Sequence, residues 1–135
     1  MKLQEAFAVV KPDLSVETVE VTPTLYADLD VRFDRFKGCL LVSSHEFDGD
    51  WPTWEVHPSG DEIVLLLAGA ARMLLRPDEA GEAQAVDLAE PGAYVVVPRN
   101  TWHTARISGT ARMLFITPGE GTENRADRAD LQEST

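Results

Sequence analysis

The stretch that decides the fold runs from Gly49 to Gly69 and reads Gly-Asp-Trp-Pro-Thr-Trp-Glu-Val-His-Pro-Ser-Gly-Asp-Glu-Ile-Val-Leu-Leu-Leu-Ala-Gly. It contains three side chains that can bind a metal ion, namely Glu55, His57 and Glu62. Glu55 and His57 are two residues apart, so on a β-strand both point to the same face. Glu62 opens a second apolar run, which we expect to pair back on the first as a hairpin through the intervening turn residues. A fourth candidate ligand, His103, follows about 40 residues later.

Short apolar runs separated by Gly and Pro continue on both sides of this stretch. Eight of them predict β-strands, at residues 39–47, 51–57, 62–68, 71–76, 84–88, 93–97, 101–107 and 111–117. Short strands at fairly regular spacing, without a long helix, indicate a β-sandwich or a closed barrel. The run 63–67 is apolar at every position, which predicts that it is covered on one side by the core and on the other by a second layer, such as a neighbouring subunit.

The two ends of the chain differ in composition from this central part. We expect residues 1–35 to form an N-terminal arm with one edge strand and a short helix from Thr22 to Asp30, with Thr22 as N-cap and Pro23 at the first helical position. The alternative for the helix is an irregular loop. Residues 36–118 would form the barrel. Residues 119–135 are a polar tail with too few apolar side chains to join a core, for which we expect disorder or a solvated helical turn over 123–131.

Length, charge and cysteine content narrow the functional classes. A chain of 135 residues predicts one domain, and its net charge of −11 argues against binding to nucleic acid or to an anionic membrane surface. The sequence has no apolar run approaching the roughly 18 residues of a membrane helix, and its start lacks the pattern of a secretory signal. The single cysteine, Cys39, excludes an internal disulfide and a thiolate cluster, and we interpret it as a small buried hydrophobe. These features predict a cytoplasmic protein.

The spacing of glycine, histidine and glutamate in the opening stretch resembles the first motif of the cupin superfamily. That motif runs Gly, five residues, His-x-His, three or four residues, Glu, six residues, Gly, and the stretch from Gly49 to Gly69 reproduces every spacing. Glu55 stands where the family has its first histidine.

A second segment resembles the second cupin motif, which runs Gly, five residues, Pro-x-Gly, two residues, His, three residues, Asn. Here Gly92, Pro98 and His103 follow it, while Asn100 replaces the motif glycine and Ile107 replaces the final asparagine. Asparagine also tolerates a left-handed turn conformation, so the change at Asn100 is readily accommodated. The resemblance spans about residues 38 to 117.

The resemblance implies an all-β, cupin-like double-stranded β-helix (a jelly-roll barrel) with one divalent metal near its centre. Carried onto this sequence, the metal ligands are Glu55, His57, Glu62 and His103. Two imidazoles and two carboxylates would neutralise a dication and suit Zn, Fe, Mn or Ni. The role of Glu55 stays open between ligand and general base or hydrogen-bond acceptor. Many members with a replaced ligand have lost the metal, and the two carboxylates would then line a polar cavity.

Two function hypotheses follow from different classes. The first is a metal-dependent enzyme, such as a dioxygenase or an isomerase, that acts on a small oxygenated or carboxylate-bearing molecule with Glu55 as its candidate catalytic group. The second is a non-catalytic ligand-binding or sensor cupin, metal-free in one version, similar to the cupin domains of anti-sigma factors. In both cases we expect a small-molecule ligand and a homodimer.

Three further residues near the motifs are candidates for the rim of the site. Trp51 shares a strand face with Glu55 and could form the mouth of a pocket, although plain core packing explains it equally well. Arg99 lies in the loop before His103 and is a candidate for holding a substrate carboxylate, with an exposed loop charge as the alternative. We interpret His45 as a surface or rim histidine.

Overall fold

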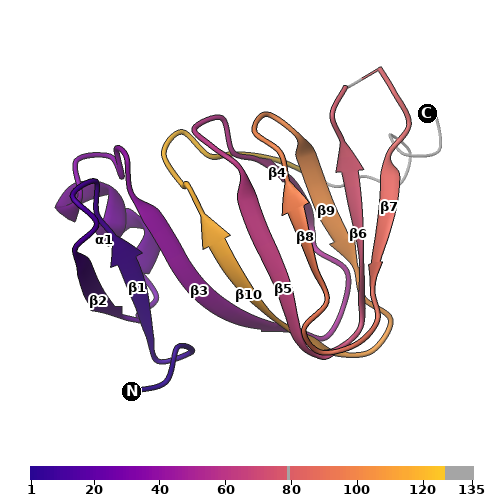
Figure 1. The fold of residues 1–135 in the computed structure, drawn as a ribbon, viewed down its shortest axis with the longest axis horizontal. Helices are drawn as coiled ribbons and strands as arrows, with labels where there is room; N and C mark the ends of the chain where they lie inside the picture. The colour runs from indigo at the N-terminus through magenta and orange to yellow at the C-terminus, as the bar shows by residue number, and fades with distance from the viewer. Residues whose placement is uncertain (79, 127–135) are drawn as a thin grey trace.

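Two antiparallel β-sheets facing each other form most of the molecule, with one short helix beside the N-terminal hairpin (Figure 1). The computed structural model describes residues 1–78 and 80–126. The described strands are β1 Ala6–Val10, β2 Val16–Glu20, β3 Leu40–Phe47, β4 Thr53–Val56, β5 Glu62–Gly69, β6 Ala71–Arg76, β7 Gln84–Leu88, β8 Tyr94–Val97, β9 Trp102–Arg106, β10 Ala111–Thr117 and β11 Glu123–Ala126, and the helix is α1 Leu25–Arg32. One sheet has the order β2-β1-β3-β10-β5-β8 and the other β11-β4-β9-β6-β7. The predicted jelly-roll architecture is therefore confirmed, and each predicted strand is present.

The predicted hairpin between the first two motif strands is wrong. β4 pairs with β9 and β11 in the five-stranded sheet, whereas β5 pairs with β10 and β8 in the six-stranded sheet. The turn residues 58–61 therefore carry the chain from one sheet to the other. Glu62 is still close to His57, but the two residues approach each other across the interior of the sandwich and not through strand pairing.

The N-terminal arm contains two strands instead of the one expected. β1 and β2 form a hairpin, and β1 also pairs with β3, so the hairpin extends the six-stranded sheet. Helix α1 begins later than predicted, after Thr24 as N-cap, whose hydroxyl donates to the Asp28 carboxylate at 2.9 Å instead of capping the backbone. Leu25 and Leu29 are buried in the core, while Tyr26 lies outside it and is 59% exposed. No helix among the described residues is long and apolar enough to cross a lipid bilayer.

A left-handed turn connects α1 to β3 and shapes the N-terminal side of the molecule. Asp34, Arg35 and Phe36 have φ values of 52°, 56° and 61° in succession. Their conformation buries Phe36 in a second apolar cluster beneath the helix, together with Leu25, Leu29 and the predicted buried thiol, Cys39. The helix is thereby fixed beside the inner face of β3.

The main core lies between the two sheets and takes the alternate residues of each strand. On β5, Val64 and Leu66 are fully buried, while Ile63 and Leu67 on the opposite face are 36% and 38% exposed. The second layer expected over this apolar strand is thus not supplied by the described part of the chain.

The polar tail also departs from expectation. Residues Glu123–Ala126 form strand β11, which pairs with β4 along its free edge. The expected helical turn over 123–131 is therefore wrong for its first four residues, and its remainder lies outside the described residues. The partner strand decides the structure here, because a short polar segment can hydrogen-bond to a sheet edge without contributing to a core.

Two motif positions take the backbone conformations that their residue types suggest. Asn100, which replaces the motif glycine, has a φ of 62°, as predicted for a left-handed turn. Gly69 has a φ of +79°, and a Cβ atom at this position would collide with the Thr110 carbonyl oxygen. Gly69 therefore ends β5 where the backbone of the neighbouring turn comes too close for any side chain.

Candidate metal centre

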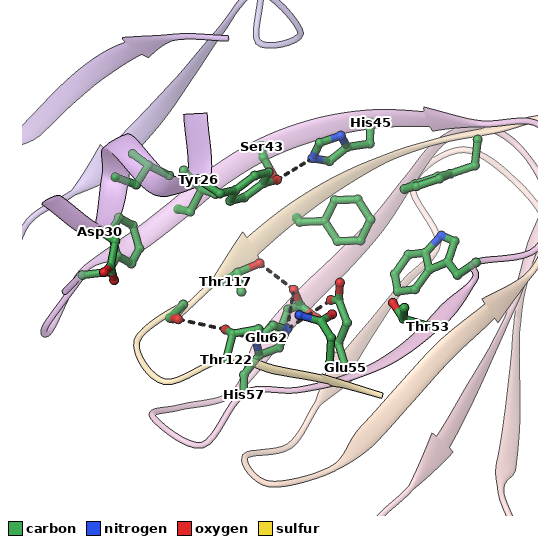
Figure 2. Close-up of a pocket in the computed structure, with 18 of the residues that line it drawn as sticks. Tyr26, Asp30, Ser43, His45, Thr53, Glu55, His57, Glu62, Thr117 and Thr122 are labelled. Atoms are coloured by element: carbon green, nitrogen blue, oxygen red, sulfur yellow. Dashed lines mark hydrogen bonds and ion pairs between the residues drawn. The ribbon is translucent and has the colours of Figure 1, made fainter. Parts of the chain in front are cut away.

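Four side chains from both motifs meet inside the sandwich, near one end of the two sheets. Glu55 and His103 are direct cross-strand neighbours on β4 and β9, and His57 follows β4 two residues after Glu55. The ligand atoms of Glu55, His57 and His103 lie within 4.8 Å of one another. Glu62 enters from the start of β5 in the facing sheet, and Figure 2 shows it beside Glu55 and His57.

Glu62 is held between the two imidazoles and is 2% exposed. Its Oε1 lies 3.0 Å from Nε2 of His103, and its Oε2 lies 3.4 Å from Nε2 of His57. The Thr117 hydroxyl, at the end of β10, donates to Oε2 at 2.5 Å. The carboxylate is thus oriented by a neighbouring strand before any ligand is added.

The contacts of His57 determine which of its ring nitrogens carries the proton. Nδ1 lies 2.8 Å from the hydroxyl oxygen of Thr122, which itself donates to the carbonyl oxygen of Gly119 at 2.8 Å. A threonine hydroxyl has one proton, so here its oxygen can only accept, and Nδ1 of His57 must be the donor. In the neutral ring the Nε2 lone pair then faces the site.

The same logic applies to His103, which is fully buried. Its Nδ1 lies 3.0 Å from the carbonyl oxygen of Thr101, and a carbonyl cannot donate. Nδ1 is therefore protonated, and Nε2 is the nitrogen directed at Glu62. An imidazole that donates through one nitrogen to a fixed acceptor and presents the other as a lone pair is typical of a metal ligand.

With both rings neutral and protonated on Nδ1, three buried polar atoms at the centre have no hydrogen-bond partner within the described residues: Nε2 of His57, Nε2 of His103 and Oε1 of Glu62. Two neutral imidazole lone pairs facing a carboxylate repel it, so the arrangement requires protons or a cation between these groups. A divalent cation would accept electron pairs from all of them and would be neutralised by Glu55 and Glu62. The donor set therefore fits a borderline divalent metal such as Zn, Fe, Mn or Ni.

Without a metal, the same groups share protons. Burial alone would raise the pKa of Glu62, but hydrogen bonding and charge from the two imidazoles outweigh it and lower the pKa to about 2. Burial opposes the charged form of His103, yet Glu62 beside it raises the pKa of this imidazole. Burial, reinforced by the Glu62 charge, raises the pKa of Glu55. Glu55 is consequently the carboxylate of the pair that takes up a proton more easily.

A cavity of about 580 Å³ opens from this centre. Glu55, His57 and Glu62 line its inner end. Its walls also include Phe47, Trp51 and Phe115, which we call the aromatic wall, and its rim includes Tyr26, Asp30 and His45. This volume lies within the usual range for a small-molecule site.

The two predicted substrate-binding residues differ in their placement. Trp51 is 7% exposed, lines the cavity and packs against His103 with ring centroids 6.3 Å apart. Its indole Nε1 is buried and has no hydrogen-bond partner among residues 1–78 and 80–126. Arg99 is exposed outside the cavity lining, and its backbone N–H donates to the Asp61 carboxylate at 2.8 Å. Trp51 thus both lines the cavity and belongs to the core between the sheets, whereas Arg99 lies outside the cavity lining.

Several residues of the site were not identified from the sequence. Thr117, Thr122 and Asn124 orient or flank the candidate ligands, with Asn124 on β11 directly opposite Glu55. Thr122 and Asn124 alternate with charged residues, which is a weak strand signal, but nothing in the sequence places this strand beside β4. Tyr26 reaches the cavity only because α1 packs beside β3.

Comparison with known proteins supports the fold assignment. No family model matches the chain, and no curated protein matches it. Among solved structures, oxalate oxidase is similar at a TM-score of 0.52 and 18% identity, over 62% of this chain and 44% of that chain. Oxalate decarboxylase is similar at a TM-score of 0.50 and 20% identity, over 60% of this chain and 21% of the other. The chain thus spans less than half the length of either enzyme.

Similarity at this level of identity establishes the architecture alone. It agrees with the two facing antiparallel sheets. The chain therefore has the fold of the cupin superfamily.

Proposed function

We propose that this protein is a metal-dependent enzyme that acts on a small molecule carrying carboxylate or neighbouring oxygen groups. One observation carries the proposal. Two buried imidazoles, each anchored through Nδ1–H, direct their Nε2 atoms at a shared carboxylate, whose oxygens lie 3.0 Å from one and 3.4 Å from the other, at the inner end of a cavity large enough for a substrate. With both rings neutral, no hydrogen bond satisfies these Nε2 atoms, whereas a metal ion would accept both of their lone pairs.

In this proposal His57, His103 and Glu62 hold the metal, and Glu55 is either its fourth ligand or a base beside it. The bound metal would supply Lewis acidity toward substrate oxygens and, for Fe or Mn, redox chemistry. The chain itself contributes positioning, because Thr117, Thr122 and Thr101 fix the orientation of the three ligand side chains. The raised pKa of Glu55 suits a group that accepts a proton from a bound substrate.

Metal content tests this assignment directly. Protein purified without a nickel column or chelator would be analysed by elemental mass spectrometry, and we expect about one equivalent of Zn, Fe, Mn or Ni per chain. His103→Ala should lose the metal, whereas His45→Phe, which alters the third histidine, should retain it. Loss in Glu55→Ala as well would make Glu55 a ligand, and retention would make it a base or hydrogen-bond acceptor beside the metal. Unchanged metal in both alanine variants would contradict the site.

Catalysis needs a separate measurement. Metal-loaded protein would be incubated in air with mixtures of hydroxy, keto and phenolic carboxylic acids, and their consumption followed by NMR. We expect consumption of one class that depends on the metal and falls in Glu55→Gln. The second candidate is a non-catalytic ligand-binding module, favoured by the proton-sharing contacts that hold Glu62 between the imidazoles even without an ion. Saturable binding without consumption would support that module instead.

We further propose that the protein is a cytoplasmic homodimer. The exposed apolar residues on the outer face of β5 and β8 support a second copy as the missing outer layer. The net charge of −11 favours a small-molecule partner over nucleic acid or an anionic membrane. A single buried cysteine is consistent with a reducing compartment.

A further inference from the structure

A hydrogen-bonded pair lies at the rim of the cavity, away from the candidate metal ligands. The Tyr26 hydroxyl on α1 and Nε2 of His45 on β3 are 3.0 Å apart, and both residues line the cavity. We call them the distal pair. Figure 2 shows this pair on one side of the pocket and Glu55, His57 and Glu62 on the other. Neither residue belongs to the motifs that supply the metal ligands.

The aromatic wall spans the space between the distal pair and the candidate metal centre. Ring centroids lie 5.9 Å apart between His45 and Phe115, 5.8 Å between Phe115 and Trp51, and 6.3 Å between Trp51 and His103. A ligand that reaches from the metal to the distal pair must therefore lie along a row of rings. Phe47 adds to the same surface, with centroids 5.3 Å from Trp51.

The cavity is larger and less polar than a small diacid requires. At roughly 30 Å³ per water molecule, its 580 Å³ would hold on the order of 20 waters. A two- or three-carbon acid on the metal would leave the aromatic wall in contact with water. A flat apolar body would displace that water and gain the burial free energy.

The distal pair is neutral, which restricts what it can recognise. Burial lowers the pKa of His45, so the imidazole is uncharged at neutral pH. Although 59% of Tyr26 is exposed at the rim, burial of its hydroxyl and the negative charges of Glu55 and Glu62 raise its pKa to about 12. Asp30, which also lines the cavity, adds no positive charge. A neutral donor or acceptor fits this end better than a second carboxylate.

We infer that Tyr26 and His45 determine ligand specificity, selecting molecules with a metal-binding oxygen group at one end, a flat apolar body, and a neutral hydrogen-bonding group at the other end. This inference rests on the proposed metal-dependent function, since the metal end orients the ligand. Tyr26 and His45 act here by binding the ligand and take no part in the chemistry.

Matched probes measure each part of this description. Dissociation constants for acetate, trans-cinnamate, trans-4-hydroxycinnamate and trans-4-carboxycinnamate would be measured by calorimetry on metal-loaded protein, with benzoate and 4-hydroxybenzoate as a shorter pair. We expect cinnamate to bind at least about tenfold more tightly than acetate because its ring is buried. The hydroxyl at the far end should increase affinity by a further factor of roughly three to ten in one of the two pairs, either the cinnamates or the shorter benzoates. The distal carboxylate should give no such increase.

Variants test whether the distal pair causes the increase in affinity that the probe's hydroxyl gives. Tyr26→Phe and His45→Phe keep the rings but remove the hydrogen-bonding atoms, and each should abolish the gain while leaving cinnamate binding within about twofold. Tyr94→Phe, on the outer face of β8 and 63% exposed, is the matched control and should keep the full gain. Thermal unfolding of each variant checks that it is folded.

The possible failures are distinguishable. If neither hydroxylated probe binds more tightly in the wild type, or if the gain persists in both distal variants, the inference is wrong even when metal content confirms the proposed function. If the wild type binds no metal, the proposed function fails, and the hydroxyl gain is then measured on the metal-free protein. A gain that disappears in the distal variants would still establish their role in recognition.

Discussion

At the scale of single residues, three threonines decide what the charged groups of the site can do. The backbone carbonyl of Thr101 and the hydroxyl of Thr122 accept from Nδ1–H of His103 and His57, and the hydroxyl of Thr117 donates to Glu62. The candidate ligand side chains are therefore oriented by contacts that do not require a metal. Hydrogen bonds that orient metal ligands commonly have a large effect on metal affinity, because they fix the ring or carboxylate in the direction of the metal.

Replacing the hydroxyl of Thr122 should weaken metal binding. Thr122→Val keeps the shape of the side chain but removes the acceptor for Nδ1–H of His57. We expect a drop in metal affinity of roughly 10- to 100-fold, measured by competition with a chromophoric chelator. Thr18→Val, an exposed change on β2, serves as the control. Equal affinities in the two variants would mean that Thr122 does not position His57.

The metal-free site should give the protein an unusual dependence of stability on pH. The pKa of Glu62 is lowered from 4.5 to about 2. Its contribution to the free energy of unfolding is therefore present above pH 4.5 and is lost as the pH falls toward 2. The pKa of His103 is raised above 6.5, so its contribution is present below pH 6.5 and lost as the pH rises through the raised value. Chelator-treated protein should therefore be most stable between about pH 4.5 and 6.5. Lowering the pH from 4.5 toward 2 should reduce its free energy of unfolding by up to about 3 kcal/mol.

Urea unfolding across this pH range measures the effect. Glu62→Gln should flatten both the acid and the alkaline side of the profile, since it removes one partner of each interaction. Glu46→Gln alters an exposed acid paired with Arg112 and should leave the profile nearly unchanged. A Glu62→Gln profile as steep as that of the wild type would show that other groups cause the pH dependence.

At the scale of elements, the site depends on where strands end. His57 and Glu62 flank the turn that carries the chain from one sheet to the other, and Thr117 lies at the last position of β10. The strand ends can meet in this way only if the paired strands keep their register along their whole length, up to the opposite end of each sheet. Gly69, at the far end of β5, is one of the residues that make this possible.

Substitution of Gly69 should destabilise the fold. Gly69→Ala combines an unfavourable positive φ with a collision between Cβ and the Thr110 carbonyl oxygen. We expect a loss of at least about 2 kcal/mol in the free energy of unfolding, measured with urea. Gly109→Ala tests the neighbouring turn, where an added Cβ meets nothing within 4 Å, and should change stability far less. Similar losses in both variants would contradict the steric explanation.

At the scale of the whole molecule, the outer face of the six-stranded sheet is unusually apolar at β5 and β8. Ile63 pairs with Val96 and Leu65 pairs with Tyr94 across these strands. Three of these four residues are at least 36% exposed, and Leu67 further along β5 is 38% exposed. A chain with a net charge of −11 can keep such a face soluble, but self-association would remove it from water.

Charges placed on this face should separate the proposed dimer. We expect Leu67→Glu combined with Val96→Glu to convert dimers to monomers in sedimentation equilibrium, because each carboxylate would have to be desolvated at the interface. Val31→Glu, on the 84% exposed side of α1, is the control and should remain dimeric. A wild type that sediments as a monomer at high concentration would exclude the proposed assembly.

Local chemistry made much of this protein predictable. Strands with alternating apolar residues and turns with Gly or Pro depend on neighbouring residues only. The strands of the barrel and the left-handed conformation of Asn100 could therefore be predicted from the sequence. Motif spacing likewise indicated Glu55, His57, Glu62 and His103 as a group. The hairpin between the strands of the first motif was wrong because local pattern does not say which sheet a strand joins.

The sequence by itself determined the all-β class, the order of the main strands and the residue types able to bind a metal. Only the tertiary structure decided the tautomers of His57 and His103, the pairing of polar β11 with β4, and the approach of Tyr26 to His45. The physical reason is that these features depend on contacts between segments far apart in the chain. Hydrogen bonds and strand pairing across such distances are set by the packing of the sheets and the helix, and local residue patterns carry no record of them.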